Sequence, residues 1–186
     1  MFTRLMQTID RIATPRNTLL VFLGLLPFNL FLFPWRSRTL AKILGYTPRL
    51  FDTRLPYTPQ EVHTLATNMG QAGRQLYAAT EVTLDLAYPV LYTTLLSLLL
   101  TLVWRKARPD WAGRRWLALL PYLGMVGDLT ENASLASLMI LFPQEPEWLA
   151  WFSNLASLVK WSAGVASFAM IVVGLGIHIF NHNPKS

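Results

Sequence analysis

The chain has 186 residues, of which 53% are hydrophobic and only 14% are charged, with a formal net charge of +6. This apolar excess fits one membrane domain better than a soluble globule, and the basic residues gather at the ends of apolar runs, which argues against nucleic-acid binding. The absence of cysteine excludes disulfides, thiolate metal ligands and a thiol nucleophile.

The chain opens with an amphipathic segment, which predicts a short helix lying in the membrane interface. Its apolar and polar residues recur at helical spacing on opposite faces: Phe2, Leu5, Met6, Ile9, Ile12 and Ala13 against Arg4, Gln7, Thr8 and Arg11. The uncharged run 18–34 follows and is just long enough to span an apolar core of about 30 Å. Because no small-residue cleavage site follows it, we interpret this run as an uncleaved anchor.

A long external loop is predicted over residues 35–82, and it contains one further helix. Thr58-Pro59-Gln60-Glu61 has the pattern of a capping box with proline at the first helical position. An apolar face follows, and Gly70 and Gly73 favour a bend in the middle. We expect this helix to rest on the outer leaflet or to cap the bundle. The apolar face comprises Val62, Leu65, Ala66, Met69, Leu76 and Tyr77.

Three more apolar runs, 83–104, 116–142 and 148–179, complete a predicted single all-α membrane domain. Its fold class is a polytopic antiparallel bundle of four transmembrane helices, with the interfacial and loop helices added. The loop 105–115 is strongly basic, whereas the loop 143–147 carries two acids and no base. The positive-inside rule therefore predicts that both termini are cytoplasmic, in the cytoplasmic (inner) membrane. The basic residues of loop 35–82 argue against this orientation, but long loops obey the rule weakly.

The third predicted span carries charges that a lipid environment disfavours by about 3 kcal/mol each. Asp128, Glu131 and Asn132 share one helical face, and the fourth span carries Lys160 near its middle. From the rise per residue, Asp128 and Lys160 each lie roughly 17 Å deep from opposite surfaces. We therefore predict an interhelical ion pair near the midplane, in which one acid is protonated and the other pairs with Lys160.

The second predicted span adds Asp85, Tyr88, Pro89 and Tyr92 on one face. Pro89 is expected to kink the helix and to free a carbonyl that a neighbouring hydroxyl satisfies. Asp85 either joins the midplane cluster or pairs only with Arg74. An alternative is that all these groups simply hold the helices together through hydrogen bonds; it is favoured for the tyrosines and carries equal weight for the two acids.

The spaced polar residues resemble those of a family of bacterial four-span membrane proteins that has no assigned activity. The resemblance implies the fold and a candidate outer mouth of Asp52, Arg54 and Arg74 near Asp85, but no reaction. The residues that carry it are Phe51-Asp52-Thr53-Arg54, Tyr57-Thr58-Pro59-Gln60-Glu61-Val62, Gly70, Gly73-Arg74, Tyr77, Asp85, Tyr88-Pro89, Tyr92, Asp128 and Glu131-Asn132.

Three functional hypotheses stay open. The first is a non-enzymatic protein whose polar core binds a proton, an ion or a lipid headgroup. The second is a lipid-modifying enzyme that uses Asp85, Asp128 and Glu131 as acid–base groups or as ligands of a divalent cation. The third is an accessory subunit of a larger membrane complex. No nucleophile, nucleotide or metal motif is present, so no cofactor or metal is predicted. The expected partners are the bilayer, further copies of the chain or a larger complex, and not nucleic acid.

Overall fold

A computed structural model describes residues 2–51 and 56–182, and within these ranges the chain forms helices and no strand. Three stretches are long and apolar enough to cross a membrane: Pro15–Leu44, Pro59–Ala107 and Glu147–Asn181. The chain is therefore a membrane protein. Its elements, in order, are α1 (Phe2–Ile12), α2 (Pro15–Pro27), the π-helical η1 (Phe28–Leu32), α3 (Phe33–Leu44), α4 (Pro59–Glu81), α5 (Leu84–Ala107), α6 (Arg114–Leu117), α7 (Leu120–Leu141) and α8 (Glu147–His182).

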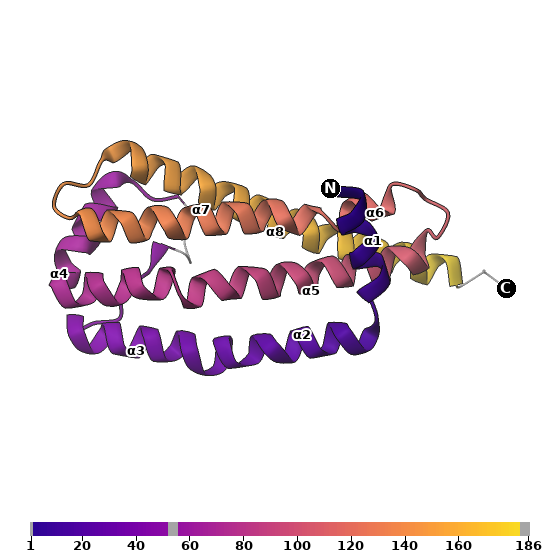
Figure 1. The fold of residues 1–186 in the computed structure, drawn as a ribbon, viewed down its shortest axis with the longest axis horizontal. Helices are drawn as coiled ribbons and strands as arrows, with labels where there is room; N and C mark the ends of the chain where they lie inside the picture. The colour runs from indigo at the N-terminus through magenta and orange to yellow at the C-terminus, as the bar shows by residue number, and fades with distance from the viewer. Residues whose placement is uncertain (1, 52–55, 183–186) are drawn as a thin grey trace.

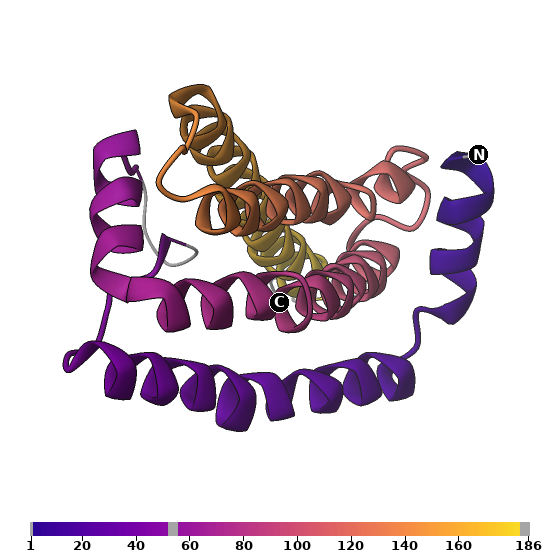
Figure 2. The same ribbon diagram turned by 60° about the vertical axis from the view of Figure 1, so that its left-hand side comes forward.

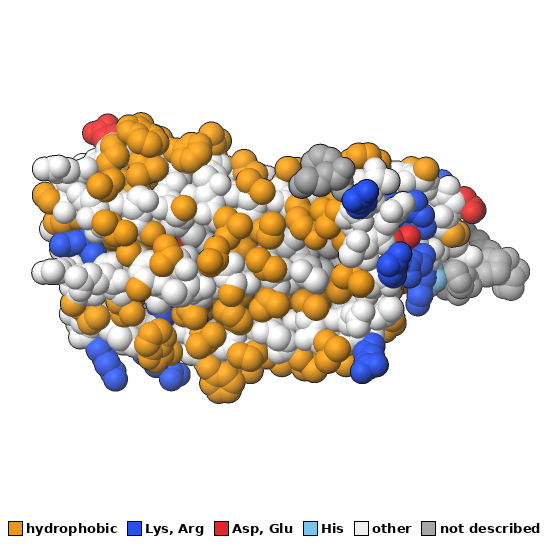
Figure 3. All heavy atoms as spheres, viewed as in Figure 1, with side chains coloured by type: hydrophobic (Ala, Val, Ile, Leu, Met, Phe, Trp, Pro, Cys, Tyr) orange, Lys and Arg blue, Asp and Glu red, His pale blue; other side chains and the backbone are white. Residues whose placement is uncertain are grey.

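The long helices run side by side along the long axis of the molecule (Figure 1). The continuous rod α2–η1–α3 lies along one side and contacts α5 and α4, whereas α7 packs on α4, α5 and α8. Successive helices reverse direction, so both chain ends lie at the same end of the bundle, where α1 crosses the ends of the long helices (Figure 1). Apolar side chains cover much of the visible face (Figure 3).

The first apolar helix does not end at residue 34, where the predicted loop begins, but continues to Leu44. Gly45 ends it in the left-handed region, with φ of 76°, and its N–H binds the Ala41 carbonyl. Arg36 therefore lies on α3 and not in a loop. It shares one helical face with Leu40, and both residues are buried. The extension thus brings a cation from a predicted loop into the protein core.

The capping box that begins α4 is present: Thr58 accepts from the Glu61 N–H, and Glu61 accepts from the Thr58 N–H. Gly70 has φ of 59° and ψ of −177°, so it breaks the helical path. Figure 2 shows α4 as two arms at a steep angle, the second leading into α5. A residue with a side chain would be strained at this φ, which explains why glycine occupies the bend.

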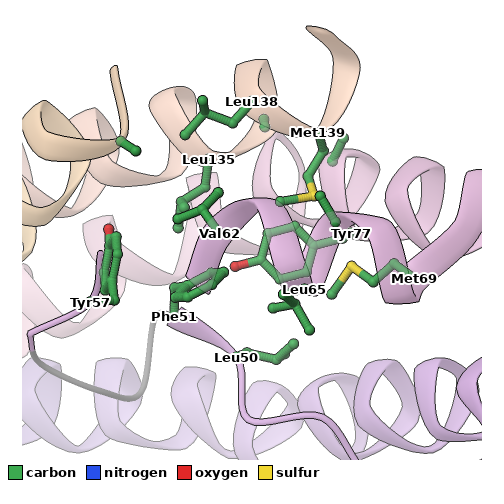
Figure 4. Close-up of a cluster of buried hydrophobic side chains, with 14 of the residues drawn as sticks. Leu50, Phe51, Tyr57, Val62, Leu65, Met69, Tyr77, Leu135, Leu138 and Met139 are labelled. Atoms are coloured by element: carbon green, nitrogen blue, oxygen red, sulfur yellow. The ribbon is translucent and has the colours of Figure 1, made fainter. Parts of the chain in front are cut away.

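The apolar face of α4 packs against α7. Of the two predicted positions, on the outer leaflet or as a cap on the bundle, the structure supports the cap. Figure 4 shows Val62, Leu65 and Tyr77 lying with Leu135 and Leu138 of α7, and all five are at most 8% exposed. The preceding segment adds Phe51 and Tyr57 to the same cluster. This apolar cluster lies between α4 and α7 (Figure 4), and α4 stands at the end of the bundle opposite the termini (Figure 1).

The α1 helix packs on α5 and α6, and its residues Met6 and Ile9 are buried. Its only acid, Asp10, forms ion pairs with three arginines that flank the α5–α7 connection. Burial raises the pKa of Asp10, but hydrogen bonds and charges of Arg105 and Arg114 outweigh it, and the net pKa is lowered. This charge cluster therefore fixes α1 across the end of the bundle.

Candidate functional site

The centre of the bundle holds a three-membered ionic cluster. The Lys160 Nζ on α8 lies 2.9 Å from Asp128 Oδ1 and 3.0 Å from Glu131 Oε2, both on α7. The two acids are 4% and 0% exposed. The sequence predicts that only one acid pairs with Lys160, but in the structure the ammonium contacts both, because the two carboxylates project from adjacent positions on one helical face.

The ammonium reaches both acids because α7 and α8 approach each other closely at Gly127. A Cβ added there would lie 2.7 Å from the Ala156 carbonyl oxygen and 2.8 Å from the Lys160 backbone nitrogen, and both are backbone atoms of α8. Small residues permit such backbone contact between membrane helices. Gly127 precedes Asp128 directly and lies one turn before Glu131, so the contact places the acids beside Lys160.

Two tyrosines complete the surroundings of the acids. The Tyr92 hydroxyl on α5 donates to Asp128 Oδ2 at 2.9 Å. The Tyr57 hydroxyl donates to Glu131 Oε1 at 3.3 Å and lies 2.7 Å from Ser153 Oγ. Burial and the nearby charge of Glu131 raise the pKa of Tyr57, so this hydroxyl keeps its proton as a donor. Each carboxylate therefore receives one hydrogen bond from a phenol and one from Lys160.

A second ionic group lies in the core beside the first. Arg36 of α3 pairs with Asp85 of α5 and approaches Glu81 of α4, with 3.7 Å between Arg36 Nη1 and Glu81 Oε1. All three side chains are at most 9% exposed. The sequence does not predict Arg36 or Glu81 as site residues, and Tyr57 is named there only among the residues that carry the family resemblance. The sequence signal for this group is the i, i+4 spacing of Glu81 and Asp85.

Asn132 connects the two ionic groups through the backbone of α5. Its side-chain amide donates to the Asp85 carbonyl at 2.6 Å. That carbonyl would normally accept the N–H of residue 89, but residue 89 is proline and has no N–H. The sequence predicts a hydroxyl as the replacement donor, and the structure supplies an amide from α7 instead. Asn132 thus compensates for the proline and joins α7 to α5.

The remaining predicted site residues lie apart from the acids. Tyr88 faces the α2–η1–α3 rod, where it donates to Asn29 Oδ1 at 3.4 Å and packs edge-on against Phe33. Arg74 does not pair with Asp85; it donates to the Ala66 carbonyl at 2.9 Å, and its guanidinium lies 3.9 Å from the Phe142 ring centre. The other two predicted residues of the outer mouth, Asp52 and Arg54, lie outside the described residues.

The three carboxylates of the enzyme hypothesis belong to two separate ionic groups, because Asp85 binds Arg36 whereas Asp128 and Glu131 bind Lys160. Within residues 2–51 and 56–182, no cluster of three or more acid, histidine or cysteine side chains is arranged to hold a metal ion. The polar core consists of buried carboxylates paired with Arg36 and Lys160.

No protein-family model, curated protein or solved structure matches this chain. The resemblance to a four-span family therefore remains a prediction.

Proposed function

We propose that the chain is a four-span protein of the cytoplasmic membrane with both termini in the cytoplasm. The span to be added to the three apolar stretches is α7, the third in chain order, which has 22 residues and is about 33 Å long at the helical rise of about 1.5 Å per residue. Leu123, Val126 and Ile140 of α7 are each more than half exposed, as a lipid-facing surface requires. The orientation is supported by the strongly basic loop 105–115, which lies at the same end as the termini (Figure 1).

We further propose that the Asp128–Glu131–Lys160 cluster binds one proton. The observation that carries this proposal is the charge of the cluster: two carboxylates face one ammonium, and both carboxylates are almost completely buried. An uncompensated negative charge is costly in a low-dielectric interior, and adding a proton to one acid removes it. The phenols of Tyr57 and Tyr92 fix the carboxylates in place but cannot neutralise them.

A proton fits this site better than the other ligands that the sequence leaves open. Glu131 is fully buried and Asp128 is 4% exposed, so a lipid headgroup would have to displace the tyrosines to reach them. A divalent cation would have to compete with Lys160 for the same two carboxylates. The enzyme hypothesis also requires Asp85, whose carboxylate is bound to Arg36.

Infrared spectroscopy tests proton binding directly. We expect the wild type at neutral pH to show the stretching band of a protonated carboxyl group, and we expect Glu131→Gln or Asp128→Asn to change or remove that band. Asp110→Asn is the matched control, because Asp110 is exposed in the α5–α7 connection. If the wild type shows no such band, the proposal is wrong.

Proteoliposomes test whether the bound proton moves across the membrane. A proton flux that the wild type and Asp110→Asn share and that Asp128→Asn lacks would support transport. If Asp128→Asn retains the full flux of a transporting wild type, the cluster takes no part in it. These measurements separate proton binding from proton transport, because the infrared band is independent of flux.

A further inference from the structure

The end of the bundle that holds the termini is strongly basic. Among the described residues it carries eight basic side chains and only two acidic ones, Asp10 and Asp110. Figure 3 shows the basic side chains gathered there, beyond the apolar belt. We name this surface the basic end; its basic members are Arg4, Arg11, Arg16, Arg105, Lys106, Arg108, Arg114 and Arg115.

Only part of this positive charge is neutralised within the protein. Arg105, Arg114 and Arg115 share the single carboxylate of Asp10. Arg11, Lys106 and Arg108 are exposed and form no ion pair with a described residue. The opposite end differs, because its exposed bases Arg38, Lys42 and Arg49 are accompanied by three acids, Glu61, Glu145 and Glu147.

Aromatic side chains place the basic end at the depth of lipid headgroups. Trp116 is 60% exposed and Trp111 is 41% exposed, and both lie in the connection between α5 and α7. Tryptophan favours the boundary between headgroups and acyl chains. The exposed Arg108 and Arg115 are each within three residues of one of these tryptophans. Exposed cations next to interfacial tryptophans are typical of a surface at the depth of lipid phosphate groups.

From this juxtaposition we propose that the basic end binds the headgroups of anionic phospholipids. Charge complementarity identifies the ligand, because basic residues close to a membrane attract anionic lipid with about 1 kcal/mol each. The amphipathic α1 crosses the same end, and Asp10 holds it beside the arginines. The surface is separate from the Lys160 cluster, so this proposal does not depend on proton binding.

Electron paramagnetic resonance of spin-labelled lipids tests the proposal. The protein is placed in phosphatidylcholine vesicles that contain a trace of spin-labelled phosphatidylglycerol or spin-labelled phosphatidylcholine, and the motionally restricted fraction gives relative association constants. We expect the wild type to prefer phosphatidylglycerol. The triple variant Lys106→Gln, Arg108→Gln and Arg115→Gln should reduce this preference by at least about fivefold, which is the factor for losing a single attraction of about 1 kcal/mol.

The matched control is Arg38→Gln, Arg49→Gln and Lys42→Gln, which removes the same charge from exposed positions at the opposite end. This control should keep the preference. An equal loss in both triple variants, or no preference in the wild type, overturns the proposal. If the first triple variant does not fold, the wild type is measured at high ionic strength instead. Raising the ionic strength of wild-type samples to about 1 M shortens the screening length to about 3 Å and should abolish the preference. A preference that survives this salt also overturns the proposal.

Discussion

Replacing Asn132 tests how the core compensates for Pro89. In Asn132→Leu the buried Asp85 carbonyl loses its donor, and an unsatisfied buried polar group costs about 1–3 kcal/mol. Interhelical hydrogen bonds in membranes contribute less, about 0.6 kcal/mol on average and about 1.7 kcal/mol at most. Asn132 Oδ1 is itself buried without a partner among the described residues, so its removal offsets part of the loss. We therefore expect a destabilisation of about 1–2 kcal/mol.

A double-mutant cycle with Pro89→Ala isolates the proposed cause. Alanine at position 89 restores an N–H that can bind the Asp85 carbonyl within α5, so Asn132→Leu should cost about 1 kcal/mol less in that background. The free energy of unfolding is measured in mixed micelles by titration with dodecyl sulfate, with helicity as the signal. Ser137→Ala is the control on the same helix, because its hydroxyl binds only the Ala133 carbonyl of α7.

The proposed compensation for Pro89 is refuted if Asn132→Leu lowers the free energy of unfolding by the same amount in both backgrounds. Such a result would show that the amide stabilises the protein through packing and not through the carbonyl that proline leaves free. Coupling between Ser137→Ala and Pro89→Ala would also count against it, because these residues share no hydrogen bond in the structure.

Three further predictions concern the helix contact, the ionic cluster and α1. Gly127→Ala should destabilise the protein by about 1–3 kcal/mol because the new methyl group meets backbone atoms of α8. Gly164→Ala is the control and should be neutral or slightly stabilising, because nothing lies within 4 Å of a methyl group added there. Denaturant titration compares the two variants, and equal effects would contradict the close contact. Lys160→Met should lower the free energy of unfolding by about 3 kcal/mol because it leaves two buried acids without a cation. Adding Glu131→Gln should recover part of this stability. A double variant less stable than Lys160→Met would show that the acids do not need the ammonium. Because the pKa of Asp10 is lowered from 3.8 in the folded protein, its stabilising effect is complete above that value and is lost as pH falls through the folded pKa. Thermal melts of Asp10→Asn should therefore lie below wild type at pH 6 and approach it below about pH 4, and a constant difference would refute the linkage.

The acids and the lysine could be anticipated from sequence because helix geometry alone relates them. Asp128 and Glu131 share a face by spacing, and the rise per residue places Lys160 at the same depth. Tyr57 and Arg36 could not be placed in this way, because their burial is decided by long-range packing. Arg36 follows an apolar run in the manner of a topology-setting charge, and only its partners on α4 and α5 show that the helix carries it into the core.

The close helix contact and the ionic cluster act as one device. Membrane helices gain little from the hydrophobic effect among themselves, so α7 and α8 need backbone contact and polar bonds to associate. Gly127 permits the contact, and the contact brings Lys160 within 3.0 Å of both acids. In the proposed four-span arrangement, separating the helices would therefore expose two carboxylates and an ammonium to lipid. The charge of the cluster therefore bears on both proton binding and helix association. A lost flux reports on the proton only where the variant keeps the unfolding free energy of the wild type.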